Sequence, residues 1–286
     1  MRLAVYQGPG ASGDVPANLA TVRRVAAEAA SQGVRLVVFP ELFVTGYNLG
    51  PRLRELAEPR GGPSLAEVSG AAAAAGIAIL VGFCERADER LFNGAALVER
   101  DGRQLAVHRK CHLYGATERA LFTPGDALTL AELDGLRLGV LMCYDVEFPE
   151  AARTLALAGA ELIAVPTALM APHDVVARTL VPARAAENQI FVAYANRTGR
   201  EGDLHYVGQT CIVGPDGADL ARAGCDEETL LLADLDVGAI VRARAAQSYL
   251  RHRRPDLYAP LPGRPPIRRC PDAPGEQGSE PAARRQ

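Results

Sequence analysis

The stretch LRLGVLMCYDVEFPE, residues 136–150, contains the change of pattern that decides the fold. Its apolar run, residues 136–145, predicts a buried strand, and Pro149 stands where a helix reaching about Ala158 would begin. The next apolar run, ELIAVPT at residues 161–167, predicts another strand. Because a strand, a helix and a strand follow one another, this stretch indicates an α/β protein.

The same alternation extends outward in both directions. Apolar, strand-forming stretches and Ala-rich, helix-forming stretches alternate along the chain, the first at residues 2–8, 34–41, 77–86, 190–199 and 229–236, the second at about 15–32 and 64–75 and up to Asn188. Asp101-Gly102 and Pro215-Asp216-Gly217 are turn signals between strands. Since such hairpins join antiparallel strands, we expect mixed sheets rather than purely parallel ones.

Composition narrows the class of protein. With 286 residues, 48% of them apolar, the chain can form a substantial core. We expect one domain over residues 1–262 and a disordered tail over 263–286, which is rich in Pro, Arg, Glu and Gly. A net charge of −3 does not suggest nucleic acid or an anionic membrane as partner, and no apolar run approaches the ~20 residues of a membrane span.

The six cysteines form no CxxC pair and have no histidine at zinc-ligand spacing, and neither GxGxxG nor GxxxxGK[ST] occurs. We therefore expect reduced thiols, a cytoplasmic location, and no metal or organic cofactor. The start, MRLAVYQGPG, is interpreted as a first strand and not as a signal peptide.

Three stretches place a reactive side chain just after a predicted strand. VVFPELFVTGY presents Glu41, AVHRKCHLYG presents Lys110, and GVLMCYDVEFPE presents Cys143. Residues just past strand ends in α/β folds meet at one edge of the sheet. A carboxylate there can take the thiol proton, the thiolate can attack a carbonyl-like carbon, and an ammonium can stabilise the oxyanion.

These three motifs, with RAAENQIFVAYANRTG at residues 184–199, resemble the nitrilase superfamily, the carbon–nitrogen hydrolases. The resemblance covers roughly residues 1–260 and implies a four-layer αββα sandwich with two mixed β-sheets. It also implies a homodimer or a larger even-numbered homo-oligomer. The partners expected are a small amide and water.

The resemblance also implies roles for individual residues. Glu41 would be the general base, Cys143 the nucleophile and Lys110 the electrophilic stabiliser. Glu118 would support substrate placement, and the backbone N–H of Tyr144 would complete the oxyanion site.

Four further residues in the quoted motifs are candidates for substrate contact: Tyr47, Tyr114, Glu147 and Thr167. Their immediate neighbours are interpreted as structural. We expect His108 and His112 to have structural roles and Asp145 to cap the turn after the strand.

Glu147 bears on which amide is hydrolysed. Members of the superfamily that act on carboxylate-bearing amides have a motif resembling CYDxRFPE, with arginine where this chain has Glu147. A carboxylate there would repel acidic substrates and attract cationic ones, unless it only pairs with a protein arginine.

The whole pattern most resembles the 5-aminopentanamidases and the R-stereoselective amidases. We therefore expect ammonia release from a short cationic amide, such as 5-aminopentanamide or 4-guanidinobutanamide, through a cysteine thioester. The alternatives are a nitrilase acting on a small nitrile, a carbamoyl-amide hydrolase, and a non-catalytic binding subunit.

Overall fold

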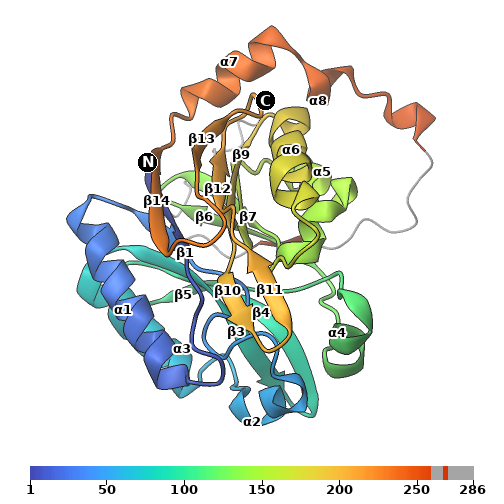
Figure 1. The fold of residues 1–286 in the computed structure, drawn as a ribbon. Helices are drawn as coiled ribbons and strands as arrows, with labels where there is room; N and C mark the ends of the chain where they lie inside the picture. The colour runs from blue at the N-terminus through green and yellow to red at the C-terminus, as the bar shows by residue number, and fades with distance from the viewer. Residues whose placement is uncertain (259–266, 270–286) are drawn as a thin grey trace, which may run out of the picture.

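The computed structural model describes residues 1–258 and 267–269, which form two large sheets packed face to face (Figure 1). The first sheet has six strands, in the order β14 (Thr229–Asp234), β1 (Arg2–Gln7), β2 (Leu36–Val38), β3 (Ala78–Ala87), β4 (Arg90–Val98) and β5 (Gln104–Arg109). The second has seven, in the order β13 (Asp219–Arg222), β12 (Cys211–Val213), β9 (Phe191–Ala195), β8 (Leu162–Pro166), β7 (Leu136–Val140), β6 (Leu128–Leu133) and β15 (Ile267–Arg269). Each sheet contains parallel and antiparallel pairs, so the predicted mixed sheets are confirmed.

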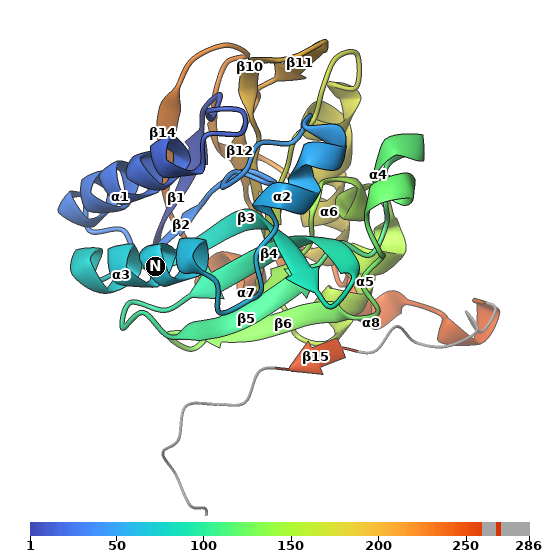
Figure 2. The same ribbon diagram turned by 90° about the horizontal axis from the view of Figure 1, so that it is seen from below.

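Helices cover the outer face of each sheet (Figure 2). The first sheet packs against α1 (Val15–Ser31) and α3 (Pro63–Ala75), and the second against α5 (Pro149–Leu157) and α6 (Val181–Asn188). The remaining elements lie at the ends and edges of the sheets: α2 (Leu53–Leu56), α4 (Gly115–Leu121), α7 (Gly238–Ala246), α8 (Tyr249–His252) and the hairpin of β10 (Thr198–Glu201) and β11 (Leu204–Val207).

Successive side chains of a strand point to opposite faces of its sheet, and this alternation produces the layers. In β1, Leu3 and Val5 face the second sheet, while Ala4 and Tyr6 face the helices. In β8, Leu162 and Ala164 point into the space between the sheets, and the intervening residues point toward α5 and α6. Three apolar cores therefore separate four layers, and the predicted αββα sandwich is confirmed.

The structure departs from the sequence prediction around the second sheet. The strand predicted over residues 136–145 ends at Val140, and Cys143–Glu147 form a 3₁₀ turn instead. The ladder cannot continue, because the Asp145 side chain accepts the N–H of Met142. The strand β6 was missed, although Asp134 and Gly135, both with positive φ, form the Asp-Gly turn that joins it to β7.

The predicted C-terminal tail is described only in part. Residues 267–269 form β15, which pairs in parallel with β6, so these three residues belong to the second sheet. The rest of the predicted tail lies outside the described residues. Within the described ranges, no helix has both the length and the apolar character needed to cross a membrane.

Gly82 on β3 allows the segment carrying Glu41 to approach the sheet. A Cβ atom at this position would lie 2.4 Å from the backbone N of Leu42 and 2.5 Å from the carbonyl oxygen of Pro40. Gly70, on the exposed side of α3, would meet nothing within 4 Å. Substitution by alanine is therefore expected to have opposite effects on stability at these two positions.

We predict that Gly82→Ala lowers the free energy of unfolding by about 1–3 kcal/mol, because the backbone at residues 40–42 must shift. Gly70→Ala, the matched control, should raise it by about 0.5–1 kcal/mol, since alanine is the better helix former. Urea unfolding of both variants checks this. A Gly82→Ala variant as stable as the parent would show that the close approach is not needed.

Candidate active site

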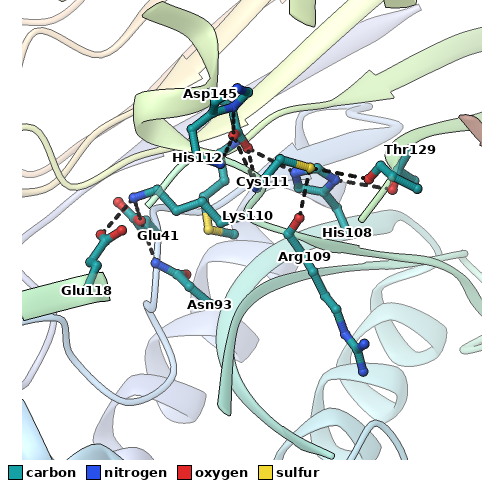
Figure 3. Close-up of polar contacts among 12 residues, drawn as sticks. Glu41, Asn93, His108, Arg109, Lys110, Cys111, His112, Glu118, Thr129 and Asp145 are labelled. Carbon is teal, nitrogen blue, oxygen red and sulfur yellow. Dashed lines mark hydrogen bonds and ion pairs between the residues drawn. The ribbon is translucent and has the colours of Figure 1, made fainter. Parts of the chain in front are cut away.

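A buried ammonium joins two of the predicted site residues. Lys110 follows β5, and its Nζ donates to Glu41 Oε1 and to Glu118 Oε1, both at 2.7 Å (Figure 3). Glu41 follows β2, and Glu118 lies on α4, eight residues after the lysine. All three side chains are at most about 5% exposed. Elements that are distant in sequence thus bring one positive and two negative groups together away from water.

Glu41 is oriented through only one of its carboxylate oxygens. Asn93 on β4 donates its side-chain N–H to Glu41 Oε1 at 2.7 Å, and the backbone N–H of Glu41 donates to the carbonyl of Thr167 at 3.2 Å. Glu41 Oε2 is buried and has no hydrogen-bond partner among the described residues. That oxygen is therefore available to accept a proton from a reacting group.

Asn93 was missed by the sequence interpretation. The backbone N–H of Lys110 donates to the carbonyl of Asn93 at 2.8 Å, so the two residues are neighbours across the β4–β5 hairpin. Counting residues back from the turn at Asp101-Gly102 pairs position 93 with position 110. The hairpin register was the signal that could have found this residue.

Cys143 begins the 3₁₀ turn after β7 and has a φ of 45°. A positive φ at a non-glycine residue is uncommon and costs conformational energy, which the surrounding structure must supply. Burial and the charge of Glu41 raise the pKa of the Cys143 thiol, while Lys110 acts in the opposite direction. The resting group is therefore the neutral thiol.

The charges of the cluster hold one another in place. Burial lowers the pKa of Lys110, but the charges of Glu41 and Glu118 outweigh it and hold that pKa well above its usual value. Burial also raises the pKa of Glu41, against the opposing effect of Lys110. Lys110 is consequently a permanent cation, and Glu41 is a stronger base than an exposed glutamate.

A cavity of about 210 Å³ opens beside Glu118. Its wall includes Tyr47, whose hydroxyl donates to Glu118 Oε1 at 2.7 Å, and Tyr114, whose backbone N–H donates to Glu118 Oε2 at 2.8 Å. The other carboxylate in the wall is that of Asp203, which accepts a hydrogen bond from Asn48. None of the described residues that line the cavity is Lys, Arg or His. Since Lys110 compensates Glu118, the wall retains the negative charge of Asp203.

The other predicted site residues have different surroundings. Thr167 is fully buried and does not line the cavity; its carbonyl holds Glu41 instead. The ring of Tyr144 packs edge-on against that of Tyr114, with the centroids 5.3 Å apart. Tyr144 thus contacts a residue of the cavity wall without lining the cavity itself.

Glu147 is half-buried at the end of the 3₁₀ turn. Burial raises the pKa of its carboxyl, while the charges of His173, Lys110 and Arg184 act in the opposite direction. Its carboxylate makes no hydrogen bond or ion pair to any described residue. The neighbouring Arg184 donates to the backbone carbonyls of Val146 and Glu147 and pairs with the carboxylate of Glu187. No described arginine forms a direct ion pair with Glu147, although the charge of Arg184 acts on its carboxyl, so the role of Glu147 stays a prediction.

Asp145 does more than cap the turn that follows the strand. Its carboxylate accepts hydrogen bonds from the backbone at Cys111, His112 and Met142 and from two histidine rings. In the part of the chain that the structure describes, no group of three or more His, Cys, Asp or Glu side chains could hold a metal ion. The polar groups around Asp145 therefore form hydrogen bonds with one another.

Known proteins are similar to this chain in both sequence and fold. The carbon–nitrogen hydrolase family model matches residues 2–245. A Pseudomonas protegens protein named "Hydrolase in pqqF 5'region" is 47% identical over 264 residues, covering 91% of this chain and 92% of that one. An (R)-stereoselective amidase of Pseudomonas sp. is 37% identical over 255 residues, covering 89% and 92%.

The solved structures agree with this assignment. A crystal structure of an amidase from Nesterenkonia sp. superimposes with a TM-score of 0.82 at 36% identity, covering 90% of this chain and 94% of that one. Fold, sequence and amidase relatives therefore point to one chemistry. The chain belongs to the carbon–nitrogen hydrolase family of the nitrilase superfamily and is an enzyme of the kind that hydrolyses linear amides.

Proposed function

We propose that this enzyme releases ammonia from a short aliphatic amide bearing a terminal amine or guanidine, through a thioester on Cys143. The observation that carries the choice of substrate is the half-buried carboxylate of Glu147, which ends the 3₁₀ turn that Cys143 begins and has no direct ion-pair partner among the described residues. The negatively charged, cation-free lining of the adjacent cavity adds to it. A cationic substrate would give the Glu147 carboxylate a direct ion-pair partner in addition to the more distant charges of His173, Lys110 and Arg184.

In the first half of the reaction, Glu41 Oε2 takes the proton of the Cys143 thiol as Sγ bonds to the amide carbon. Lys110 and the backbone N–H of Tyr144 stabilise the oxyanion that forms. When the oxyanion collapses, the C–N bond breaks and Glu41 returns the proton to the departing nitrogen. Ammonia leaves, and the acyl group remains on sulfur as a thioester.

In the second half, Glu41 takes a proton from water as the water oxygen bonds to the thioester carbon. The second oxyanion meets the same two donors, Lys110 and the N–H of Tyr144. Its collapse breaks the C–S bond, and the proton held by Glu41 returns to the sulfur. The carboxylic acid leaves, and the neutral thiol is restored.

The solved relatives support this chemistry. In the Nesterenkonia amidase, one variant shows covalent addition of the acetamide moiety of fluoroacetamide at the active-site cysteine. Another shows the product of Michael addition of acrylamide at that cysteine. A third structure of that enzyme contains butyramide. An enzyme of this fold thus has a reactive cysteine and binds a small aliphatic amide.

Charge should decide between amides of equal length. A cation close to Glu147 in a partly desolvated cleft gains more than it would in water, whereas an anionic amide meets repulsion. The rings of Tyr47 and Tyr114 in the cavity wall can also lie against a cation. Cationic amides are therefore favoured over neutral ones, and neutral amides over acidic ones.

For the wild-type enzyme we predict that kcat/KM for ammonia release falls from 5-aminopentanamide to pentanamide to glutaramate, by about tenfold or more at each step. The three amides have similar length and differ in terminal charge. Steady-state assays of ammonia check the order. Glutaramate as the best substrate would refute the cationic preference, and faster turnover of 5-aminopentanenitrile than of its amide would favour the nitrilase alternative.

Removing the charge of Glu147 should reduce the preference for the cationic amide over the neutral one. We predict that Glu147→Gln raises KM for 5-aminopentanamide about tenfold and leaves pentanamide within about twofold, because only the cation loses a partner. Glu150→Gln is the matched control, since this exposed carboxylate lies three residues away on α5. Equal effects of the two substitutions would show that Glu147 acts only through net charge.

A further inference from the structure

We propose that Asp145 is a positioning residue, which sets the Lys110 ammonium relative to the Cys143 thiol. This inference builds on the proposed function, because it takes Lys110 as the group that stabilises the oxyanion. Asp145 is fully buried and lies two residues after Cys143. It reaches the backbone that flanks both catalytic residues.

The carboxylate bridges the ends of two strands that belong to different sheets. Oδ1 accepts the backbone N–H of His112 at 2.8 Å and that of Cys111 at 3.2 Å, directly after Lys110. Oδ2 accepts the backbone N–H of Met142 at 3.1 Å, directly before Cys143. One group therefore links the end of β5 to the end of β7, and Figure 3 shows the contacts of Asp145 with Cys111 and His112 on the β5 side.

Two imidazoles hold the carboxylate itself. His108 Nε2 lies 3.1 Å from Oδ2, and His112 Nδ1 lies 2.8 Å from Oδ1. Because a carboxylate only accepts, both of these nitrogens carry the hydrogen. His108 Nδ1 can then accept from the hydroxyl of Thr129, at 3.2 Å. Both histidines, expected to be structural, thus orient Asp145.

The same contacts keep Asp145 ionised. Burial raises the pKa of this carboxyl, but hydrogen bonds from His108 and His112 outweigh burial and hold the pKa well below its usual range. An ionised carboxylate offers two acceptor oxygens to its five donors. Hydrogen bonds to a charged acceptor are about twice as strong as neutral ones, so the bridge is stiff.

Thr129, His108 and Asp145 follow the hydroxyl–imidazole–carboxylate order found in many hydrolases. Here the arrangement is not a second active site. The three side chains are buried, and the cavity that Thr129 lines has a volume of only about 10 Å³, about that of one water molecule. The geometry therefore supports orientation of Asp145 and no separate reaction.

Replacing Asp145 by Asn would conserve its shape and break the bridge. One acceptor oxygen becomes an NH₂ group facing N–H donors, so contact is lost at the β5 end or at the β7 end. Lys110 and Cys143 would then move relative to each other. Reactions that place negative charge on a carbonyl oxygen should suffer, because that oxygen needs the ammonium.

Two reagents separate this effect from general damage to the site. Addition of the Cys143 thiol to acrylamide develops negative charge on the carbonyl oxygen, whereas displacement of iodide from iodoacetamide does not. In Asp145→Asn we expect the ratio of acrylamide to iodoacetamide labelling rates at Cys143 to fall about tenfold or more. Peptide mass spectrometry measures both rates without requiring turnover, so the outcome is independent of the substrate proposed above.

Turnover provides the second readout. For the best amide, we expect Asp145→Asn to lower kcat about 100-fold with KM within about twofold, since a displaced stabiliser acts mainly in the transition state. Glu58→Gln is the matched control, because this carboxylate accepts two hydrogen bonds at the start of α3, far from the site in sequence. It should lower stability and leave the labelling ratio and kcat unchanged.

His112→Phe keeps the test open if Asp145→Asn does not fold. Phenylalanine keeps the ring that stacks on Phe148 in this half-buried position, and loss of the Nδ1–H bond to Asp145 should lower the labelling ratio about threefold. An unchanged ratio in whichever variant folds would overturn the proposal. An unchanged ratio with both rates lowered would show that Asp145 only stabilises the fold.

Discussion

One buried ammonium between two carboxylates determines how this site works. Lys110 bonds to Glu41 and Glu118 where water is excluded, and breaking such a network would leave an uncompensated buried charge. The cluster already carries more negative than positive charge. A resting thiolate at Cys143 would add another negative charge, which explains why burial and Glu41 raise its pKa. In the proposed mechanism, formation of the Cys143 thiolate is therefore coupled to proton transfer.

The four-layer fold delivers these groups from both of its sheets. Glu41 and Lys110 follow strands of the first sheet, and Cys143 follows a strand of the second. Hydrogen bonds to Asp145 link the two sheets at this boundary. Glu147, at the end of the same turn, carries a carboxylate with no direct ion-pair partner among the described residues. In the proposed function, chemistry and selectivity thus come from residues of one 3₁₀ turn.

Local patterns predicted the α/β class and placed Glu41, Lys110 and Cys143 just after strands, and the family resemblance added Glu118, which the structure finds bonded to Lys110. They failed where a tertiary contact overrides the pattern. The apolar run after Leu136 indicates a strand to Asp145, but the side chain of Asp145 takes the N–H of Met142 and ends it. Asn93 has no motif and becomes visible only through hairpin register. Which way a side chain points is set by packing that no single stretch encodes.

The pH dependence of Cys143 alkylation by iodoacetamide tests the coupling most directly. The account predicts a rate that falls as pH drops through the raised pKa of Glu41, above the ordinary 4.5, because the base must be ionised. Above that pH the rate should be level through neutrality, and Glu41→Gln should remove the level region. A rate that instead rises through about pH 8.5, as for a free thiol, and that is unchanged in Glu41→Gln, would contradict it.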